Sequence, residues 1–566
     1  MDVSKLALPW LEHYSHPCAW DMDLPALSLP KMFADAVGRH GDAPLVDFLG
    51  RIYSYRELHG QALCFAAGLQ KMGIGKGDRV GLFLPNVPAY IPAYFGAMMA
   101  GATVVNFSPL YSAAELEVQV ADSGTRLLVT VDVPALLPTA LQVLRASPLE
   151  TLIVSSLADQ LPWLKGTAMR LFARKQLTPV PDEAGVIPWR RAIAQDGNPA
   201  PVAIDPQEDL ALLQYTGGTT GTPKGAMLTH QNLTANARQV DAIDPHNMDY
   251  DLILGALPLF HVFANTAVLN RTVFTGGAVA MLPRFDAQQV FQTLRRTRPT
   301  SLPGVPTMFQ ALLDHPKFDP ADFASLRVCI AGGAPLPQVL KQRWEARTGV
   351  RLVEGYGLTE TSGVVTANPY EGDDRPGTIG QPFPATLVRL LDREDPTRDA
   401  PPGEPGELAV HGPQVMRGYW QRPDSAATAF VERDGLRWLR TGDVAVFEGD
   451  GYLRVVDRIK DMIAVGGFKV FPSQVEHVLL EHPAVKECLV IGLPDDLMGE
   501  RPRAFVTLQD DVEADGDGLK DWLNQRIGKH ERVDAVMVRL NLPKTMIGKL
   551  DRKTLKDEVL AAASVS

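Results

Sequence analysis

The chain has 566 residues, of which 45% are hydrophobic and 21% are charged, so it is long enough to form more than one domain with large cores. Its 55 Lys and Arg against 66 Asp and Glu give a formal net charge of -11, which argues against a general attraction to nucleic acid or to anionic membranes. We expect no nucleic-acid partner. The four cysteines lie far apart, without the spacing of a zinc site or a disulfide framework, which suits a reducing compartment.

The first predicted elements are short, β-branched strands that alternate with helical stretches such as Ala113 to Ala121. This order indicates an α/β protein with largely parallel sheets. The predicted strands lie in residues 78–84, 102–107, 126–131, 151–155, 276–282 and 326–332.

The most apolar stretch runs from Val80 to Val105 and is interrupted by Pro85, Pro88 and Pro92. A helix that crosses a bilayer through these prolines would leave backbone groups without hydrogen bonds. We therefore predict a buried strand, a turn and a packed helix. The N-terminus shows no secretory signal, so we expect a cytoplasmic protein.

One segment departs from the acidic background. Residues 163–180 contain Lys165, Arg170, Arg174 and Lys175 and no acidic residue, and their apolar side chains recur near helical spacing. Two interpretations remain open: a basic amphipathic helix at the inner surface of a membrane, or a solvated helix packed on its own domain.

The second half of the chain ends in a small unit. Residues 395–405, rich in Pro and Asp, and residues 510–518, rich in Asp and Gly, are predicted loops. A hinge in residues 457–461 would divide the chain into a large domain, 1–459, and a small domain, 460–566.

A glycine- and threonine-rich loop extends from Tyr215 to Gly225, with the sequence Y-T-G-G-T-T-G-T-P-K-G. Its glycines let the backbone approach a ligand closely, and its hydroxyls and lysine suit polyphosphate. A Walker loop is disfavoured, because Lys224 follows Pro223 and is not followed by Ser or Thr. The residues predicted to bind phosphate are Thr216, Gly217, Gly218, Thr219, Thr220, Gly221, Thr222 and Lys224.

This loop resembles the phosphate-binding signature of the adenylate-forming superfamily. Further stretches resemble other motifs of that superfamily, in the same order and spacing: Ala331–Ala334 (AGGA), Glu354–Glu360 (EGYGLTE), Arg440–Asp443 (RTGD), Tyr452–Asp461 (YLRVVDRIKD) and Leu542–Arg552 (LPKTMIGKLDR). The resemblance implies a large N-terminal domain of α/β layers with a distorted β-barrel, followed by a small, mobile α+β domain.

The resemblance also implies roles in nucleotide binding. Tyr356 would stack on adenine, since the flanking glycines leave its face open. Asp443 would accept hydrogen bonds from the ribose hydroxyls, and Arg458 would reach ribose or phosphate oxygens. The other residues assigned to the nucleotide site are Gly332, Gly333, Ala334, Glu354, Gly355 and Gly357.

Four residues are candidates for the chemistry. Thr359 would bind the α-phosphate, and Glu360 would bind the Mg²⁺ that bridges phosphate oxygens. Lys549 would bridge the carboxylate and the α-phosphate and offset charge in the transition state. His261 lies in the motif beside the acyl tunnel, where it either shapes the acyl site or is a packed histidine.

A domain rotation follows from the same resemblance. Lys460 falls at the pivot position of the superfamily. After rotation, Gly466, Gly467 and Lys469 would line a channel for the coenzyme A thiol, although such glycines are also common in plain turns.

Among members of the superfamily, the chain is most similar to bacterial long-chain fatty acid CoA ligases, notably at Gly412–Asp424 (GPQVMRGYWQRPD). This implies that a medium- or long-chain fatty acid, ATP and coenzyme A are converted through acyl-AMP to acyl-CoA, AMP and pyrophosphate. Homodimerisation is a family expectation. One stretch departs from the family signature: Asp434–Arg440 is about two residues longer, with Arg440 where histidine is common. This departure leaves the length of the preferred acyl chain open.

Two alternatives remain. A fatty acyl-AMP ligase, or an enzyme that loads a carrier protein, would keep the adenylation and change the acceptor. A catalytically silent acyl or nucleotide sensor would be expected to lose Thr359, Glu360, Asp443, Arg458 or Lys549, and all five are present.

Overall fold

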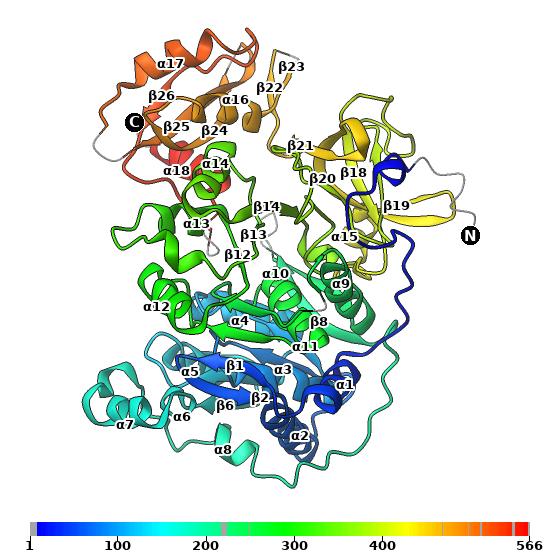
Figure 1. Ribbon diagram of the computed structural model, residues 1–566, viewed down its shortest axis with the longest axis vertical. Helices are drawn as coiled ribbons and strands as arrows, with labels where there is room; N and C mark the ends of the chain where they lie inside the picture. The colour runs from blue at the N-terminus through cyan, green and yellow to red at the C-terminus, as the bar shows by residue number, and fades with distance from the viewer. Residues whose placement is uncertain are drawn as a thin grey trace.

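The computed structural model shows a large layered body that carries a small C-terminal domain on one side (Figure 1). It describes residues 8–216, 223–247, 249–466, 468–495, 497–509, 512–545 and 549–563.

Two sheets with parallel cores form the large body. In the first, all neighbouring strands are parallel except β8 and β9, which are antiparallel. Its spatial order is β7 (Val186–Pro188), β6 (Thr151–Ser155), β5 (Leu127–Val131), β3 (Arg79–Leu82), β4 (Thr103–Asn106), β8 (Leu210–Thr216), β9 (Lys224–Thr229).

The second sheet is parallel from β14 to β1 and ends in antiparallel pairs on both sides. The α/β prediction is therefore confirmed, and each predicted strand segment forms a strand. The spatial order is β16 (Gln381–Pro382), β15 (Thr366–Ala367), β14 (Arg351–Tyr356), β13 (Val328–Ala331), β12 (Ser301–Gly304), β10 (Leu252–Gly255), β11 (Ala278–Met281), β1 (Pro44–Phe48), β2 (Arg51–Ser54).

Helices connect and cover these strands. They include α1 (Leu29–His40), α2 (Tyr55–Lys71), α3 (Tyr90–Met99), α4 (Ala113–Ser123), α5 (Leu137–Ala146), α6 (Leu157–Gln160), α8 (Trp189–Ala192), α9 (His230–Ala242), α10 (Val262–Ala264), the π-helix η4 (Asn265–Asn270), α11 (Arg271–Thr275), α12 (Ala287–Thr297), α13 (Pro306–Leu313) and α14 (Gln338–Thr348).

The apolar stretch from Val80 to Val105 is a strand, a turn, helix α3 and a second strand, as predicted. Helix α3 is buried on nearly all sides. Gly96 permits this packing, because a Cβ there would lie 2.7 Å from the carbonyl oxygen of Ala62 in α2. None of the helices in the described ranges has the length and apolar character needed to cross a bilayer.

The basic segment 163–180 is helical only in part. Helix α7 (Trp163–Phe172) is followed by a short 3₁₀ turn, η3 (Arg174–Gln176), and it lies at the edge of the large body (Figure 1). Gly166 is the buried residue of α7. A glycine fits this close contact, because a Cβ there would collide with the carbonyl oxygen of Ala158. The opposite face of α7 is solvent-exposed.

The region expected to be a distorted β-barrel is an antiparallel sheet in which β20 pairs with β18, β19 and β21. The predicted loop at 395–405 connects two of its strands. The strands are β17 (Leu387–Leu391), β18 (Gly406–His411), β19 (Phe430–Arg433), β20 (Leu436–Phe447) and β21 (Leu453–Arg458), and helix α15 (Pro423–Ala429) precedes β19.

The small domain has a hydrophobic core of its own, formed by residues such as Val475, Val490, Val506 and Leu523. This supports the proposed division of the chain near residue 460. Its elements are β22 (Ile463–Val465), β23 (Phe468–Val470), α16 (Pro472–Leu480), β24 (Val485–Asp495), β25 (Gly499–Leu508), α17 (Gly516–Asn524), β26 (Val536–Val538) and α18 (Arg552–Ala563).

The loop predicted at 510–518 is wrong at its end, because α17 begins at Gly516. The side chain of Asp515 accepts a hydrogen bond from the N–H of Gly518 at 2.5 Å, which caps the helix. The acidic and glycine-rich composition that predicted a loop also occurs at the start of this helix.

Candidate active site

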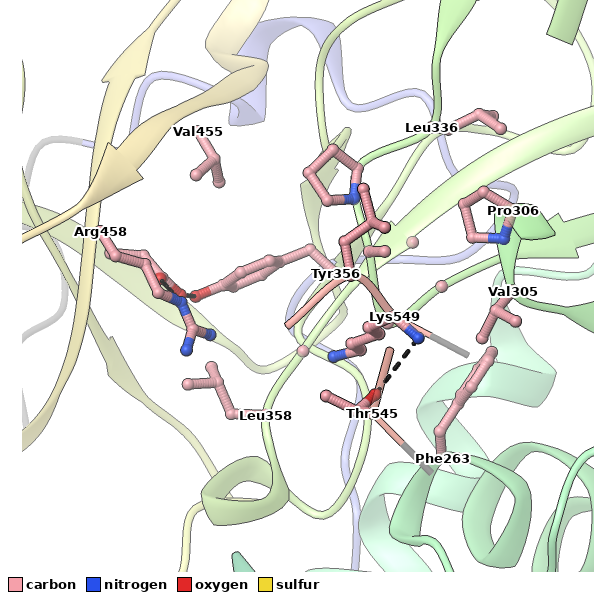
Figure 2. Close-up of a pocket in the computed structure, with 18 of the residues that line it drawn as sticks. Phe263, Val305, Pro306, Leu336, Tyr356, Leu358, Val455, Arg458, Thr545 and Lys549 are labelled. Atoms are coloured by element: carbon pink, nitrogen blue, oxygen red, sulfur yellow. Dashed lines mark hydrogen bonds and ion pairs between the residues drawn. The ribbon is translucent and has the colours of Figure 1, made fainter. Parts of the chain in front are cut away.

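A cleft of about 2500 Å³ lies where the large body meets the small domain. Its walls include the ends of β13 and β14, the middle of β20 and the C-terminal segment around Lys549. Figure 2 shows Tyr356, Arg458 and Lys549 gathered there. The cleft thus brings together motifs that lie far apart in the sequence, from Thr216 to Lys549.

The phosphate loop connects two paired strands. Thr216 at the end of β8 pairs with Lys224 at the start of β9, so the loop leaves and returns at one point beside the cleft. Both residues line the cleft. The other predicted phosphate contacts, Gly217, Gly218, Thr219, Thr220, Gly221 and Thr222, lie outside the described residues.

Tyr356 and Arg458 meet at Asp443. The Tyr356 hydroxyl donates to Oδ2 of Asp443 at 2.5 Å, and Nε of Arg458 lies 2.8 Å from Oδ1. Asp443 is only 2% exposed, so its charge is held by these two partners. The three residues that the sequence assigned to adenine and ribose therefore form one connected group.

The bulge in β20 before Asp443 is fixed by Glu407, which the sequence analysis missed. Arg440 donates to Oε2 of Glu407 from Nε at 2.9 Å and from a terminal nitrogen at 2.7 Å, and the N–H of Gly442 donates to Oε1 at 3.2 Å. Glu407 is 2% exposed. The unusual Arg440 is thus a positioning residue for the bulge of β20 beside Asp443.

Glu354 supports the segment that follows the glycine loop Ala331–Ala334. Its Oε1 accepts a hydrogen bond from the N–H of Leu336 at 3.1 Å. Burial raises the pKa of Glu354 to about 8, so this carboxyl is largely protonated at neutral pH. Gly332, Gly333 and Ala334, together with Gly355 and Gly357, line the same part of the cleft.

Thr359 and Glu360 lie in the 3₁₀ turn η6 (Thr359–Thr361) at the cleft wall. Tyr419 donates its hydroxyl to Oε1 of Glu360 at 2.8 Å, and Nζ of Lys224 lies 5.3 Å from the centre of the Tyr419 ring. Tyr419 therefore stands between the phosphate loop and the predicted metal ligand. The sequence held a signal for it in the Gly412–Asp424 motif, but no pattern distinguished this tyrosine from a core residue.

Lys549 reaches the cleft from the small domain. Its N–H donates to Oγ1 of Thr545 at 3.2 Å, as Figure 2 shows, and its carbonyl accepts from the N–H of Thr545 at 2.6 Å. A Cβ placed on Gly333 would lie 3.1 Å from Cε of Lys549. Burial and the nearby Arg458 lower the pKa of Lys549 to about 8.

His261 caps helix α10, since its Nδ1 accepts a hydrogen bond from the N–H of Phe263 at 3.3 Å. Burial and the charge of Lys549 lower the pKa of His261 to about 4, so the ring is neutral at physiological pH. It lines the cleft near Lys549. A neutral ring at this place suits the boundary between a polar nucleotide site and an apolar pocket.

The predicted hinge lies in the turn after β21, where Lys460 also lines the cleft. Asp457 accepts a hydrogen bond at 2.8 Å from the N–H of Ser473 in α16. Asp461 forms an ion pair at 2.7 Å with Arg552. Short polar contacts therefore connect the two sides of this turn.

The residues predicted to line a coenzyme A channel lie apart from the cleft. Gly466, with φ of +56°, occupies the turn between β22 and β23, and Nζ of Lys469 lies 3.8 Å from a carboxylate oxygen of Glu394 on the surface. Neither residue is among the described residues that line the cleft. Gly467 lies outside the described residues.

The family model of AMP-binding enzymes matches residues 33–420, and that of the AMP-binding enzyme C-terminal domain matches residues 474–549. The chain belongs to the AMP-binding enzyme family. These two matches cover both the large body and the segment that ends at Lys549, so the family's two parts are both present.

Several relatives match over almost the whole chain. A long-chain-fatty-acid–CoA ligase of Bacillus subtilis is 38% identical, with 97% of this chain and 98% of that protein covered. One of Escherichia coli is 40% identical, with 94% of each covered. The crystal structure of ATP-bound MatB from Rhodopseudomonas palustris is 28% identical, with a TM-score of 0.81 over 94% of this chain and 99% of that one.

Proposed function

We propose that this protein activates a medium- or long-chain fatty acid with ATP, forms an acyl-AMP, and transfers the acyl group to coenzyme A. The observation that carries the proposal is the position of Lys549, which extends from the small domain to the glycine loop at Gly333 beside Asp443 and Arg458. The names of the relatives in Bacillus subtilis and Escherichia coli support the choice of a fatty acid.

In the first half-reaction, a carboxylate oxygen of the acid bonds to the α-phosphorus of ATP. The bond from that phosphorus to the bridging oxygen breaks, and pyrophosphate leaves with the electron pair. Lys549 would hold the carboxylate against the α-phosphate and offset the charge that develops there. Thr359 would bind the α-phosphate, while Asp443 and Arg458 would hold the ribose.

The residues around Glu360 suit a magnesium ion that is held mainly by substrate phosphates. The described part of the chain has no cluster of three or more His, Cys, Asp or Glu side chains that could hold a metal by itself. Mg²⁺ commonly uses one or two carboxylates together with phosphate oxygens. Glu360 would be such a carboxylate, and the ion would neutralise phosphate charge when bound.

In the second half-reaction, we propose that the small domain rotates about Lys460. Lys549 would then leave the cleft, and Gly466, Gly467 and Lys469 would move toward it. The thiolate sulfur of coenzyme A would bond to the acyl carbon as the bond from that carbon to the phosphate oxygen breaks, which releases AMP. The present separation of Lys469 from the cleft fits the first half-reaction.

An apolar tunnel beside the nucleotide site supports an alkyl substrate. Its wall is formed by a buried cluster from α9, η4 and the strands β13 and β14. The cluster residues that also line the cleft include Val240, Ile243, Ala267, Val364 and Phe383. These side chains are apolar and suit a hydrocarbon chain.

The test of this function is mass spectrometry of products after incubation with Mg-ATP, coenzyme A and an equimolar series of fatty acids. We expect acyl-CoA and AMP, with a preference for medium or long chains. Accumulation of acyl-AMP without thioester would instead identify an acyl-AMP ligase or a carrier-loading enzyme. No product from any acid would favour a nucleotide or acyl sensor.

The lowered pKa of Lys549 predicts a pH dependence. Its ammonium form is the active one, so kcat/KM for adenylate formation should fall as the pH rises through about 8 in the free enzyme. Bound polyphosphate favours the charged lysine, so kcat should fall only at higher pH. Lys549→Arg should remove the alkaline fall, because arginine stays protonated. An unchanged alkaline limb in that variant would contradict the assignment.

We also propose that α7 contacts an anionic membrane surface. Its outer face exposes Trp163 by 76%, Leu164 by 63% and Phe172 by 88%, and Lys175 follows at its end. Apolar side chains beside basic ones suit the headgroup region of anionic bilayers. The three apolar side chains belong to α7, and Lys175 belongs to η3.

Co-sedimentation with vesicles of anionic lipid measures this contact. Trp163→Ser combined with Phe172→Ser should lower the bound fraction at least about tenfold, since each aromatic ring contributes on the order of 1.5 to 3 kcal/mol when buried. Leu540→Ser, which changes a side chain exposed by 97% in the small domain, is the matched control. Equal partitioning of the double variant and the parent would remove the membrane role.

A further inference from the structure

The apolar tunnel ends in polar side chains. Arg271, Ser301 and Tyr370 line the cleft together with the apolar residues Ile243 and Ile253. Ser301 and Ile253 are paired neighbours on β12 and β10. All three polar residues are at most 8% exposed, so this is a buried polar floor and not an opening to solvent.

The polar floor lies far from the reacting carboxylate. Arg271 follows His261 by ten residues along the continuous helical run α10, η4 and α11. At no more than about 1.5 Å per residue, this is a separation of at most roughly 15 Å. An extended backbone advances about 3.5 Å for three bonds, so an alkyl chain of roughly twelve bonds would span the same length.

Arg271 is held from behind by aspartates. Its terminal nitrogens lie 2.6 Å from Asp244 and 2.8 Å from Asp251, and its Nε lies 3.7 Å from Asp241. Nε has no hydrogen-bond partner among the residues that the structure describes, and the same holds for Oδ1 of Asp241. Because Nε is itself buried and faces Asp241, Arg271 anchors the floor and is not a free donor for a ligand.

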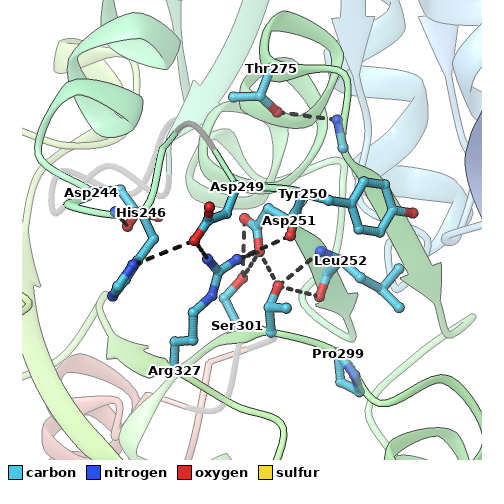
Figure 3. Close-up of polar contacts among 12 residues, drawn as sticks. Asp244, His246, Asp249, Tyr250, Asp251, Leu252, Thr275, Pro299, Ser301 and Arg327 are labelled. Atoms are coloured by element: carbon cyan, nitrogen blue, oxygen red, sulfur yellow. Dashed lines mark hydrogen bonds and ion pairs between the residues drawn. The ribbon is translucent and has the colours of Figure 1, made fainter. Parts of the chain in front are cut away.

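Figure 3 shows the support behind the floor. Ser301 donates to Asp251 at 3.2 Å, and Arg327 lies 3.6 Å from the same carboxylate. Arg327 also pairs with Asp249 at 3.0 Å. The floor is thus rigid, and the positive charge of Arg271 is already balanced by the carboxylates around it.

Tyr370 completes the floor. Its side chain packs in the apolar cluster of the tunnel wall, and the residue is 8% exposed. Within the described ranges, its hydroxyl makes no hydrogen bond. The floor therefore presents the free hydroxyl of Tyr370, together with the hydroxyl of Ser301, which can still accept a hydrogen bond.

We propose that the polar floor formed by Arg271, Ser301 and Tyr370 binds a neutral hydroxyl at the far end of the acyl chain, so that ω-hydroxy acids are preferred substrates. This inference rests on the proposed function. A plain methyl end would leave the polar groups without partners. A second carboxylate would meet an arginine whose charge is already neutralised by three aspartates, so a dicarboxylic acid should be a poor substrate.

The experiment compares kcat/KM for three acids of about twelve carbons, matched in length: the plain acid, the ω-hydroxy acid and the dicarboxylic acid. The ω-hydroxy acid should be preferred over the plain acid by about tenfold, the effect of one or two hydrogen bonds. Tyr370→Phe and Ser301→Ala should each reduce this preference, and each should raise kcat/KM for the plain acid, because a methyl end no longer leaves that hydroxyl without a partner. Tyr250→Phe is the matched control, because Tyr250 is 57% exposed.

The outcomes separate the two proposals. If the parent activates none of the acids, the proposed function fails. If the parent activates the plain acid as well as the ω-hydroxy acid or better, the polar floor does not bind the ω-hydroxyl. The same conclusion follows if the preference in Tyr370→Phe equals that of the parent. Measuring the melting temperature of each variant shows whether a lost preference reflects unfolding.

Discussion

Lys549→Ala should lower the rate of adenylate formation by on the order of 10²- to 10³-fold, the usual effect of removing one group that stabilises developing charge. The cause is that Lys549 is the cation that the small domain brings to Gly333 in the cleft. The rate is measured by acid-dependent release of pyrophosphate in the absence of coenzyme A. Binding of ATP should change much less, because Asp443 and Arg458 remain.

Two controls test whether the effect is specific to Lys549 and to the first half-reaction. Lys529→Ala removes an exposed lysine of the same domain and should keep the parent rate. With synthetic acyl-AMP supplied, Lys549→Ala should still form acyl-CoA at close to the parent rate, because the second half-reaction does not use this lysine. Adenylate formation at the parent rate in Lys549→Ala would contradict the assignment.

Asp443→Ala should raise KM for ATP about 10²-fold or more, because hydrogen bonds to a charged group contribute about 1.5 to 3 kcal/mol each. The change would also release Arg458 and the Tyr356 hydroxyl, which both contact this carboxylate. Initial rates at varied ATP measure the effect. A KM within about twofold of the parent would show that the ribose is held elsewhere.

Tyr356→Phe is the matched variant for this test. It keeps the ring that would stack on adenine and removes only the hydrogen bond to Asp443 at 2.5 Å. Its effect on KM should be no more than about tenfold. A larger loss in Tyr356→Phe than in Asp443→Ala would assign the main role to the hydroxyl and not to the carboxylate.

The fold was predictable where local signals agree with long-range packing. The strands of both sheets follow β-branched runs, and helix α4 begins at Ala113 as predicted, with Ser112 and Glu115 forming a capping box. Its end at Ser123 lies two residues beyond the prediction, because Gly124 in the left-handed conformation terminates it. The start of α17 was missed, because Asp and Gly are common both in loops and at helix starts.

The nucleotide site was largely predictable because its residues lie in contiguous motifs. Supporting residues were not, since each depends on a contact between distant segments. Glu407 holds Arg440 and the bulge of β20 before Asp443, and Tyr419 holds Glu360 across 59 positions. Nothing in the local sequence of either residue indicates such a partner.

The polar floor was even less predictable from the local sequence. In the sequence, Arg271 is one of several polar residues in a mixed helical run, and Tyr370 resembles an ordinary core aromatic. Only the packing of α11 against the segments that carry Asp244 and Asp251 reveals a buried charge group at the end of a tunnel. Pocket depth and pocket chemistry are therefore properties of the fold and not of a motif.

The most direct test of the central claim follows the oxygen of the acid. A fatty acid labelled with ¹⁸O in its carboxylate is converted in the presence of Mg-ATP and coenzyme A, and the products are analysed by mass spectrometry. If the carboxylate attacks the α-phosphorus and the thiol then cleaves the acyl–oxygen bond, one labelled oxygen must appear in AMP. Label in inorganic phosphate, with ADP as the nucleotide product, would contradict an acyl-adenylate mechanism.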